Sequence, residues 1–395
     1  MNSAKIYSFK DVILAIAISL MGFLVFNWFQ SPLQHQLNPL FDANQYQKAY
    51  EYFKGITDHY TVNYPFSVRI LVPWLAAQFP FDDIYTNFKI INLLFGIAWI
   101  PVWFIVAPTV GLDRFKTWLG WFWITFHWVD IWKANLSDPI TVDLPLYLFQ
   151  LLLLLALIKK KWWLLILIAP IATIQKESFL PILVVLCLYP GIPWLQKGKR
   201  IQFIYLLVAL ALSFITLKTT SLYFPGANTG KNAIINLFNN TLGLIGHPDL
   251  LLRWVLSLSL AYGAFIWIMI WNRKLLINSE NEFQKVLFPL VGVYLFFSLF
   301  AGGDFTRIAF LGAPFMMVLF LQRLALSYRQ WIILFVISIP VQRLFEFIPD
   351  GGSDFENWKT WYPEYAPWAW VVIYLVYTLL LALISKKYLQ VNHSH

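Results

Sequence analysis

Charged residues are scarce in this 395-residue sequence: Asp, Glu, Lys and Arg make up 12% of it, against roughly a quarter in an ordinary soluble domain. Hydrophobic residues account for 59% and aromatic residues for 19%. This composition excludes a water-soluble globular protein and predicts an all-α, polytopic membrane protein. The basic residues, which give a net charge of +9, lie in short clusters between apolar runs. That placement is typical of membrane topology, so we expect no nucleic-acid partner.

Cysteine is nearly absent as well, and the single Cys187 lies inside an apolar run. This excludes an intramolecular disulfide and argues against a thiol metal site. The sequence also lacks a Gly-rich phosphate loop, a metal-type Cys/His spacing and a repeat of solenoid period. No small-residue cleavage pattern follows the first apolar run, so we expect that run to be retained as a membrane helix.

Twelve apolar segments approach the length of about 20 residues that a helix needs to cross a bilayer. They lie at about 12–29, 88–110, 117–134, 141–158, 162–174, 178–190, 201–223, 254–272, 286–302, 308–324, 330–346 and 369–385. We therefore expect about twelve transmembrane helices in one integral membrane domain, residues 1–395. The two segments on either side of residues 175–177 are short, and one interrupted segment is the alternative there.

The basic residues also predict an orientation. With the N-terminus in the cytoplasm, the inner side holds 17 basic and four acidic residues, and the outer side holds 12 basic and 16 acidic residues. The positive-inside rule then predicts that both termini lie in the cytoplasm. We expect the protein to lie in the inner cell membrane. The long connections, residues 30–87, 224–253 and 347–368, all fall on the outer side, where long loops usually carry function.

The first outer loop contains the pattern of a helix that lies along the membrane surface. Its apolar positions repeat at i, i+3, i+4 and i+7 and are Tyr46, Ala49, Tyr50 and Phe53. This predicts an amphipathic helix with that face in the bilayer interface. Asp42 stands at its start and is our candidate catalytic base; the alternative is an N-cap of a capping box with Gln45 at N3. Similar interfacial helices are expected from Pro65 onward and within residues 224–253.

Further ionisable residues stand near the outer ends of the predicted spans, where charges usually face a cavity or one another. An outward-facing polar pocket is therefore expected. Arg307 is suited to bidentate phosphate binding and follows two glycines that allow close backbone approach. The candidate substrate-binding residues are Arg307, Asp304, Lys176, Glu177, Arg69, Asp138, Asp130 and Arg343.

Most of these candidates also have a purely structural interpretation. The alternatives are a local Asp304–Arg307 pair, a Lys176–Glu177 pair at a helix break, an Arg69 that reaches lipid phosphate, capping by Asp138 or Asp143, and a buried His127–Asp130 pair.

Several short motifs together resemble the GT-C membrane glycosyltransferases, in particular uncharacterised bacterial members. They are Phe41-Asp42 with Tyr46, Tyr64-Pro65-Phe66 with Arg69 and Pro73, an acidic second outer loop, and Gly303-Asp304-Phe305-Thr306-Arg307. The resemblance implies an extracytoplasmic active site and a polyprenyl-phosphate sugar donor. Asp42 matches the first-loop acid of that family, and Asp138 or Asp130 matches a second acid. The first loop has no Asp-x-Asp or Glu-x-Asp, so a divalent cation, Mg²⁺ or Mn²⁺, stays open.

The chemistry of the residues agrees with a transferase. A base such as Asp42 would deprotonate an acceptor hydroxyl, and cations would offset the charge of the leaving phosphate. The sequence thus predicts a glycosyltransferase that takes a sugar from a lipid-linked donor to a glycan, lipid or protein in cell-envelope polysaccharide biosynthesis. The alternatives are a secondary transporter or lipid-linked sugar flippase, for which a twelve-span layout is common, and a polysaccharide polymerase or ligase.

Overall fold

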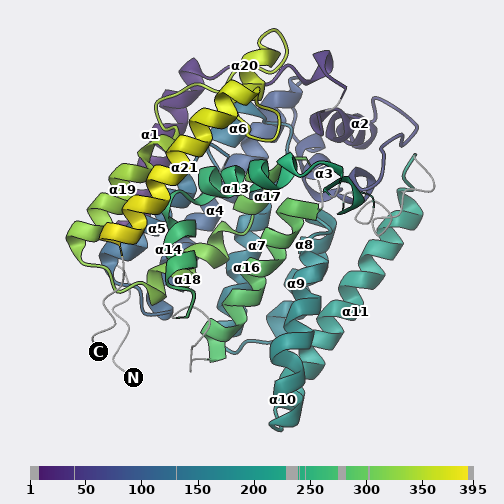
Figure 1. Ribbon diagram of the computed structural model, residues 1–395. Helices are drawn as coiled ribbons and strands as arrows, with labels where there is room; N and C mark the ends of the chain where they lie inside the picture. The colour runs from purple at the N-terminus through teal and green to yellow at the C-terminus, as the bar shows by residue number, and fades with distance from the viewer. Residues whose placement is uncertain are drawn as a thin grey trace. The chain divides into compact units, whose positions relative to one another are not determined.

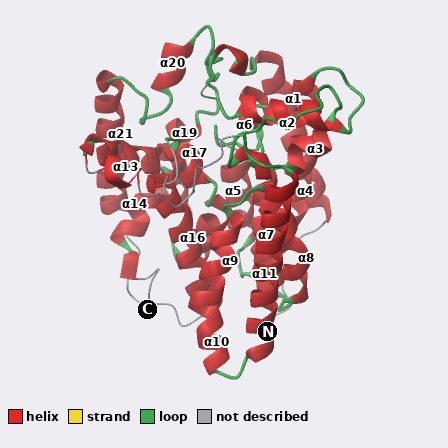
Figure 2. Cartoon of the chain, turned by 90° about the vertical axis from the view of Figure 1, so that its right-hand side faces the viewer, coloured by secondary structure: helices red, strands yellow, loops and turns green. Residues whose placement is uncertain are grey.

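The chain is all-helical in this computed structural model, which describes residues 9–39, 41–129, 131–227, 239, 241–244, 246–274, 282–300 and 303–389. Helices hold 74% of the residues, and no strand occurs within those ranges. Figure 1 and Figure 2 show helices joined by loops throughout. The all-α prediction is confirmed.

Two compact units make up the chain, and the single integral membrane domain of residues 1–395 stays a prediction. Unit 1 comprises Met1–Thr117 and Ile131–Ala233, and unit 2 comprises Trp118–Asp130 and Ile234–His395. Helix α5 (Arg114–Thr125) carries the chain from the first unit into the second.

The helices of unit 1 run from long apolar rods to single turns. They are α1 (Phe9–Phe29), η1 (His35–Leu37), α2 (Ala43–Phe53), η2 (Phe66–Val68), α3 (Leu71–Ala77), α4 (Ile84–Thr109), α6 (Lys133–Ser137), α7 (Leu144–Ile158), α8 (Trp163–Gln175), α9 (Phe179–Leu186), η3 (Cys187–Gly191), α10 (Ile192–Gln196) and α11 (Arg200–Tyr223). Those of unit 2 are α13 (Asp249–Tyr262), α14 (Ala264–Trp271), α16 (Glu282–Phe300), α17 (Phe305–Phe310), α18 (Ala313–Arg323), α19 (Tyr328–Gln342), α20 (Phe355–Thr360) and α21 (Trp368–Tyr388).

Five helices of the described chain are long and apolar enough to cross a membrane: α1, α4, α11, α21 and residues 283–300 of α16. The pair α13 and α14 adds a sixth if its two bent halves form one span. The expected count of about twelve is therefore not confirmed. Shorter apolar helices, among them α7, α8 and α18, occupy other predicted segments.

Three of the expected spans are interrupted. In segment 117–134, α5 ends at Thr125 and irregular turns follow. In segment 254–272, α13 and α14 meet at 107° across Gly263, whose φ of 55° favours glycine. In segment 308–324, α17 ends at Phe310 before α18 begins. Hydropathy alone does not reveal such breaks, because the apolar composition continues across them.

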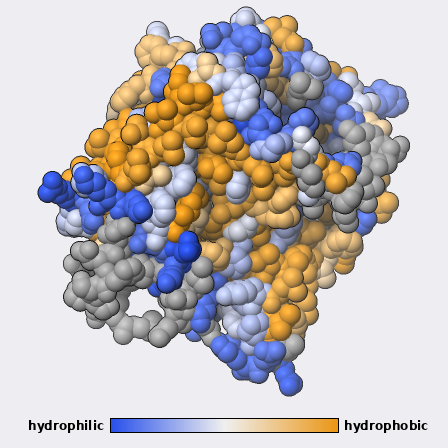
Figure 3. Space-filling view, viewed as in Figure 1, coloured by the Kyte–Doolittle hydropathy of each residue, from blue (hydrophilic) through white to orange (hydrophobic). Residues whose placement is uncertain are grey.

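Apolar side chains cover the outer face of the long helices. On α21, Val372, Ile373 and Leu380 are exposed, whereas Val371 and Leu381 are buried. Figure 3 shows hydrophobic side chains gathered over α19 and α21. A continuous apolar face of this kind is costly in water at roughly 25 cal/mol per Å². The helices are therefore compatible with a membrane protein.

Helix α2 forms as its amphipathic pattern predicts, but its apolar face contacts protein. Tyr46 and Tyr50, 1% and 3% exposed, are packed with Val72 of α3 and with Phe88 and Ile91 of α4. The predicted contact of that face with the bilayer interface is therefore not observed, because α3 and α4 cover it. This packing fixes α2 and the acid at its start.

The other two predicted interfacial segments have different outcomes. The segment that begins at Pro65 divides into the single turn η2 and the short helix α3, with Arg69 between them. The third, within residues 224–253, falls largely outside the described residues, which omit 228–238, 240 and 245.

The break between α13 and α14 gives a test of the fold. A Cβ at Gly263 would lie 2.9 Å from the Ser338 hydroxyl oxygen, on a backbone that L residues rarely adopt. We expect Gly263→Ala to lower the free energy of unfolding in detergent by about 1–3 kcal/mol. Gly292→Ala is the control, because nothing lies within 4 Å of its added Cβ inside α16. Equal stability of the two variants would contradict the role of Gly263.

Candidate functional site

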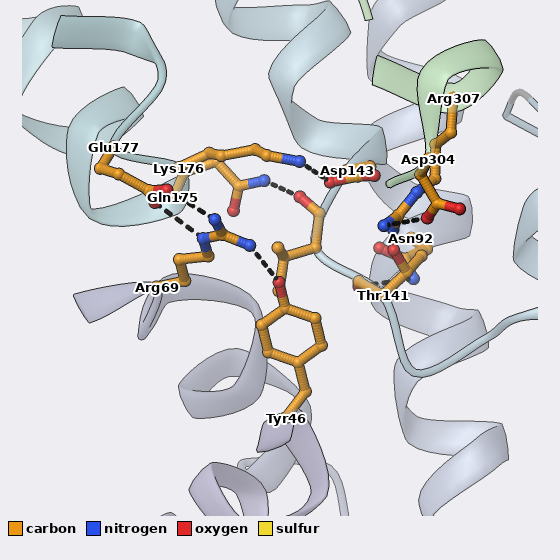
Figure 4. A network of polar contacts seen from close by, with 11 residues as sticks. Tyr46, Arg69, Asn92, Thr141, Asp143, Gln175, Lys176, Glu177, Asp304 and Arg307 are labelled. Atoms are coloured by element: carbon orange, nitrogen blue, oxygen red, sulfur yellow. Dashed lines mark hydrogen bonds and ion pairs between the residues drawn. The ribbon is translucent and has the colours of Figure 1, made fainter. Parts of the chain in front are cut away.

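A buried arginine connects three segments of unit 1. Arg69, 9% exposed, donates from Nε to Glu177 Oε2 over 2.7 Å and from Nη2 to Glu177 Oε1 over 2.5 Å. Its Nη1 donates to the hydroxyl of Tyr46 over 2.8 Å, and its guanidinium lies 5.0 Å from the ring centre of Phe66. Figure 4 shows this arrangement. Glu177 and Tyr46 therefore engage three of the five N–H donors of Arg69.

Glu177 keeps its charge although it is surrounded by protein. Burial alone would raise the pKa of this carboxyl, but the charge and hydrogen bonds of Arg69 outweigh it and hold the pKa below its usual range. The pair is bidentate, the strongest geometry that arginine and a carboxylate form. Glu177 thereby fixes the plane of the Arg69 guanidinium.

Lys176, the neighbour of Glu177, pairs elsewhere. Its ammonium contacts the carboxylate of Asp143, and both side chains are buried. Helix α8 ends at Gln175, and Lys176 has extended backbone angles, so consecutive side chains point in different directions (Figure 4). The predicted Lys176–Glu177 pair is therefore replaced by two longer-range pairs. Gln175 donates to the carbonyl of Val142 and ties the same break to the start of α7.

Asp42 occupies the first position before α2, but it does not cap the helix through its side chain. Its backbone is helical, and Gln45 uses its side-chain oxygen to accept from the Asn63 N–H over 2.9 Å. The alternative capping box is therefore not formed. Asp42 and Tyr46 stand one helical turn apart, on one face of α2.

The electrostatics around Tyr46 place two acids in this corner. Burial raises the pKa of the Tyr46 phenol, Arg69 lowers it, and Asp42 and Asp143 raise it further. Tyr46 therefore stays neutral and accepts from Arg69. Unit 1 thus gathers the predicted residues Asp42, Arg69, Lys176 and Glu177, together with Asp143, which the sequence suggested only as a cap.

Asp138 lies at the end of α6 and is half-buried. Asp143 precedes α7 without capping it through its side chain. Asp130, the other candidate second acid, falls outside the described residues. His127, its suggested partner, is buried and stacked on Phe310 at 4.0 Å between ring centres.

Arg307 and Asp304 form the local pair that was the structural alternative. Arg307 Nη2 lies 2.5 Å from Asp304 Oδ2, across the first turn of α17 in unit 2 (Figure 4). The two residues pair because they lie three positions apart, on consecutive turns of the chain. Their predicted role in substrate binding stays a prediction.

Arg343 is surrounded by aromatic side chains in unit 2. It donates to the Trp361 carbonyl over 2.9 Å and to the Tyr374 hydroxyl over 2.8 Å. Its guanidinium lies 4.4 Å from the ring centre of Trp361 and 4.9 Å from that of Trp128. These contacts join the end of α19 to α21, to Trp361 after α20 and to Trp128 in the turns after α5, a structural task that the sequence did not indicate.

Glu364 of unit 2 was missed by the sequence analysis. Its Oε2 accepts from the Ser257 hydroxyl over 3.0 Å, and its Oε1 is buried with no hydrogen-bond partner in the described structure. Burial, and then the charge of Asp304, raise the pKa of Glu364 to about 8. The sequence signal was an acid between Pro363 and Pro367 in an aromatic loop.

A divalent cation does not fit these residues. Within the described ranges, no group of three or more His, Cys, Asp or Glu side chains is placed to hold a metal ion. Two other acids of unit 1, Asp143 and Glu177, already engage Lys176 and Arg69. We therefore derive no catalytic step through Mg²⁺ or Mn²⁺.

Comparison with known proteins adds no relative. No family model, no curated protein and no solved structure matches the chain.

The Arg69–Glu177 pair gives a test of the unit 1 network. We expect Arg69→Ala to lower the free energy of unfolding by about 1–3 kcal/mol, because the half-buried carboxylate of Glu177 would be left without its cation. Removing both side chains restores part of that loss. The control is Lys359→Ala, which breaks the more exposed pair with Glu356 and costs about 0–1 kcal/mol. Unfolding titrations in mixed detergent measure the free energy of unfolding of Arg69→Ala, Glu177→Ala, the double variant and the control. If the losses of the two single variants add up to that of the double variant, the coupling is contradicted.

Glu364 predicts a pH dependence of stability. The pKa of Glu364 is about 8 in the folded chain and 4.5 when unperturbed. Between these two pH values the carboxyl is protonated in the folded chain and ionised in the unfolded chain. Stability therefore falls as the pH rises from about 5 to 8. Melting temperatures at pH 6, 7 and 8 should fall more steeply in the wild type than in Glu364→Gln. The exposed Glu356→Gln is the control, and identical slopes for wild type and Glu364→Gln would contradict the assignment.

Proposed function

We propose that this chain is a membrane glycosyltransferase that moves a sugar from a polyprenyl-phosphate donor to an acceptor outside the cytoplasm. The observation that supports it most is one corner of unit 1, where Asp42 and Arg69 both lie near Tyr46. Asp42 stands one turn before Tyr46 in α2, and Arg69 donates to the Tyr46 hydroxyl over 2.8 Å. A transfer from a lipid phosphate needs a base and an anion-binding group close together.

The location of this corner supports a lipid-linked donor. Residues 42–69 belong to the connection between α1 and α4, two helices long and apolar enough to cross a membrane. A connection between two spans emerges at the membrane boundary, where the phosphate of a polyprenyl lipid would lie while its tail stays in the hydrocarbon. The inner-membrane location and the outward orientation are part of this proposal.

Asp42 serves as the general base. Its carboxylate takes the proton of an acceptor hydroxyl, whose oxygen forms the new bond to the anomeric carbon. The bond from that carbon to the phosphate oxygen breaks, and polyprenyl phosphate leaves with the electron pair. Packing of α2 against α3 and α4 holds the base in place, which reduces the entropy lost on reaching the reactive geometry.

Arg69 binds the leaving phosphate. A guanidinium has five N–H donors, and the contacts with Glu177 and Tyr46 use three of those on Arg69. The other two can bind one phosphate group. Because Glu177 and Tyr46 already fix the orientation of the fork, little side-chain entropy remains to be lost when the phosphate binds. Lys176, the neighbour of Glu177 in sequence, is charge-compensated by Asp143, so Arg69 is the cation that this proposal assigns to the phosphate.

The proposal predicts the effect of one substitution. Asp42→Asn removes the proton acceptor and keeps the size of the side chain, so we expect the release of polyprenyl phosphate to fall by about 10²–10⁴-fold. The assay uses purified protein in liposomes with radiolabelled polyprenyl-phosphate hexoses and an envelope extract as the acceptor. Melting temperature and gel-filtration profile establish that the variant is folded.

The exposed Asp58→Asn, in the same loop, is the matched control and should retain wild-type turnover. Undiminished turnover in folded Asp42→Asn would remove Asp42 from the mechanism. Uptake of a labelled sugar without any release of polyprenyl phosphate would contradict the transferase and support a transporter.

A further inference from the structure

Unit 2 carries a row of nearly parallel aromatic rings at the loop before α21. The rings of Phe355 and Trp358 lie 5.5 Å apart at 13°, and those of Trp358 and Tyr365 lie 5.7 Å apart at 25°. Tyr365 is 40% exposed. An accessible ring of this kind presents a flat apolar surface with a polar hydroxyl at its end.

Two buried polar atoms next to this row have no hydrogen-bond partner within the described structure. They are Oε1 of Glu364 and the hydroxyl of Thr306, a residue that is 0% exposed. The backbone of Thr306 lies close enough to the Glu364 carboxyl to lower its pKa against the effect of burial, so the two residues belong to one corner of unit 2. A buried polar atom without a partner costs about 1–3 kcal/mol, which favours a ligand that supplies hydrogen bonds here.

The loop is held rigidly around that corner. Arg253 of α13 donates to the carbonyls of Pro363 and Ala366 over 2.6 and 2.8 Å, one on each side of Glu364. A Cβ added at Gly303 would lie 2.9 Å from the Tyr365 hydroxyl, so the end of the Tyr365 side chain lies directly against the turn before α17. The carboxyl and the tyrosine ring are therefore positioned before any ligand arrives, which lowers the entropic cost of binding.

From this geometry we propose that unit 2 contains a saccharide-binding site, in which a sugar ring stacks on Tyr365 and its hydroxyls bond to Glu364 and Thr306. A saccharide has both features that the site requires: an apolar face of C–H groups and hydroxyls that donate and accept. The proposal goes beyond the transfer reaction and does not depend on it. A glycan acceptor of that reaction is one ligand of the right class.

The charge of the corner selects against anions. Asp304 raises the pKa of both Glu364 and Tyr365, which means that its negative charge reaches both groups. A phosphate or carboxylate ligand would meet the same repulsion, with Arg307 already paired to Asp304. Glu364, with a pKa of about 8, is mostly protonated at neutral pH and can donate to a sugar oxygen. A neutral saccharide fits these charges.

The test uses the full-length chain in detergent on an array of neutral and anionic oligosaccharides, which includes glucose and N-acetylglucosamine oligomers. Titration of a bound oligosaccharide then compares variants. We expect Tyr365→Ala and Glu364→Asp each to weaken binding by about tenfold, in line with 0.5–1.5 kcal/mol for an aromatic contact. Tyr365→Phe keeps the ring, and Glu364→Gln keeps the shape of the protonated acid, so both should stay near wild type.

The matched controls are Phe345→Ala and Glu356→Gln, an exposed aromatic residue and an exposed acid of unit 2. Both should bind as the wild type does. The proposal fails if no neutral oligosaccharide on the array binds, if binding is confined to anionic glycans, or if folded Tyr365→Ala and Glu364→Asp bind with wild-type affinity. If Tyr365→Ala does not fold, Tyr365→Leu and Glu364→Asp decide the outcome. Loss of transfer in Asp42→Asn with saccharide binding intact would separate this site from the reaction.

Discussion

The bidentate contact between Arg69 and Glu177 is the interaction on which the candidate site of unit 1 depends. It joins residues 108 positions apart in sequence and connects the turn before α3 to the break between α8 and α9. Taking two charges away from water is expensive, and only close geometry with further hydrogen bonds offsets that cost. The third hydrogen bond, to Tyr46, holds α2 against this pair and so positions Asp42 at the start of that helix. One guanidinium thus organises the carboxylate of Glu177, the tyrosine and the helix that begins after Asp42, the proposed base.

The sequence predicted the helices well where one local pattern decides them. The i, i+3, i+4, i+7 spacing of α2 and the long apolar runs of α1, α4, α11 and α21 correspond to helices. It did not predict what those helices face. The apolar face of α2 was interpreted as a lipid-facing one, yet α3 and α4 bury it. The spacing of apolar residues alone cannot distinguish lipid from protein as the partner of an apolar helix face, because both environments favour the same side chains.

The same limit applies to the charged residues. Arg69, Lys176 and Glu177 were singled out because charges near membrane depth are rare, and Asp42 because it stands at the start of an amphipathic helix. Their pairing was not predictable, since the extended backbone at Lys176 turns two neighbours toward different partners. Glu364 was missed for a related reason: its burial comes from contacts with Ser257 and the region of Asp304, both remote in sequence. A single acid in an aromatic loop has no local signature of such burial.

The two units use opposite electrostatic arrangements, and this difference bears on what each could bind. In unit 1, buried cations keep neighbouring carboxylates ionised, as the lowered pKa of Glu177 shows. Guanidinium donors held in this way suit an anionic group. In unit 2, burial and a neighbouring acid raise the pKa of Glu364 to about 8, which leaves a neutral acid beside aromatic rings. Such a corner suits hydroxyls and an apolar ring face. The proposed phosphate ligand of unit 1 and the proposed neutral polyol of unit 2 rest on the same rule, that burial keeps a charge only where an opposite charge stabilises it.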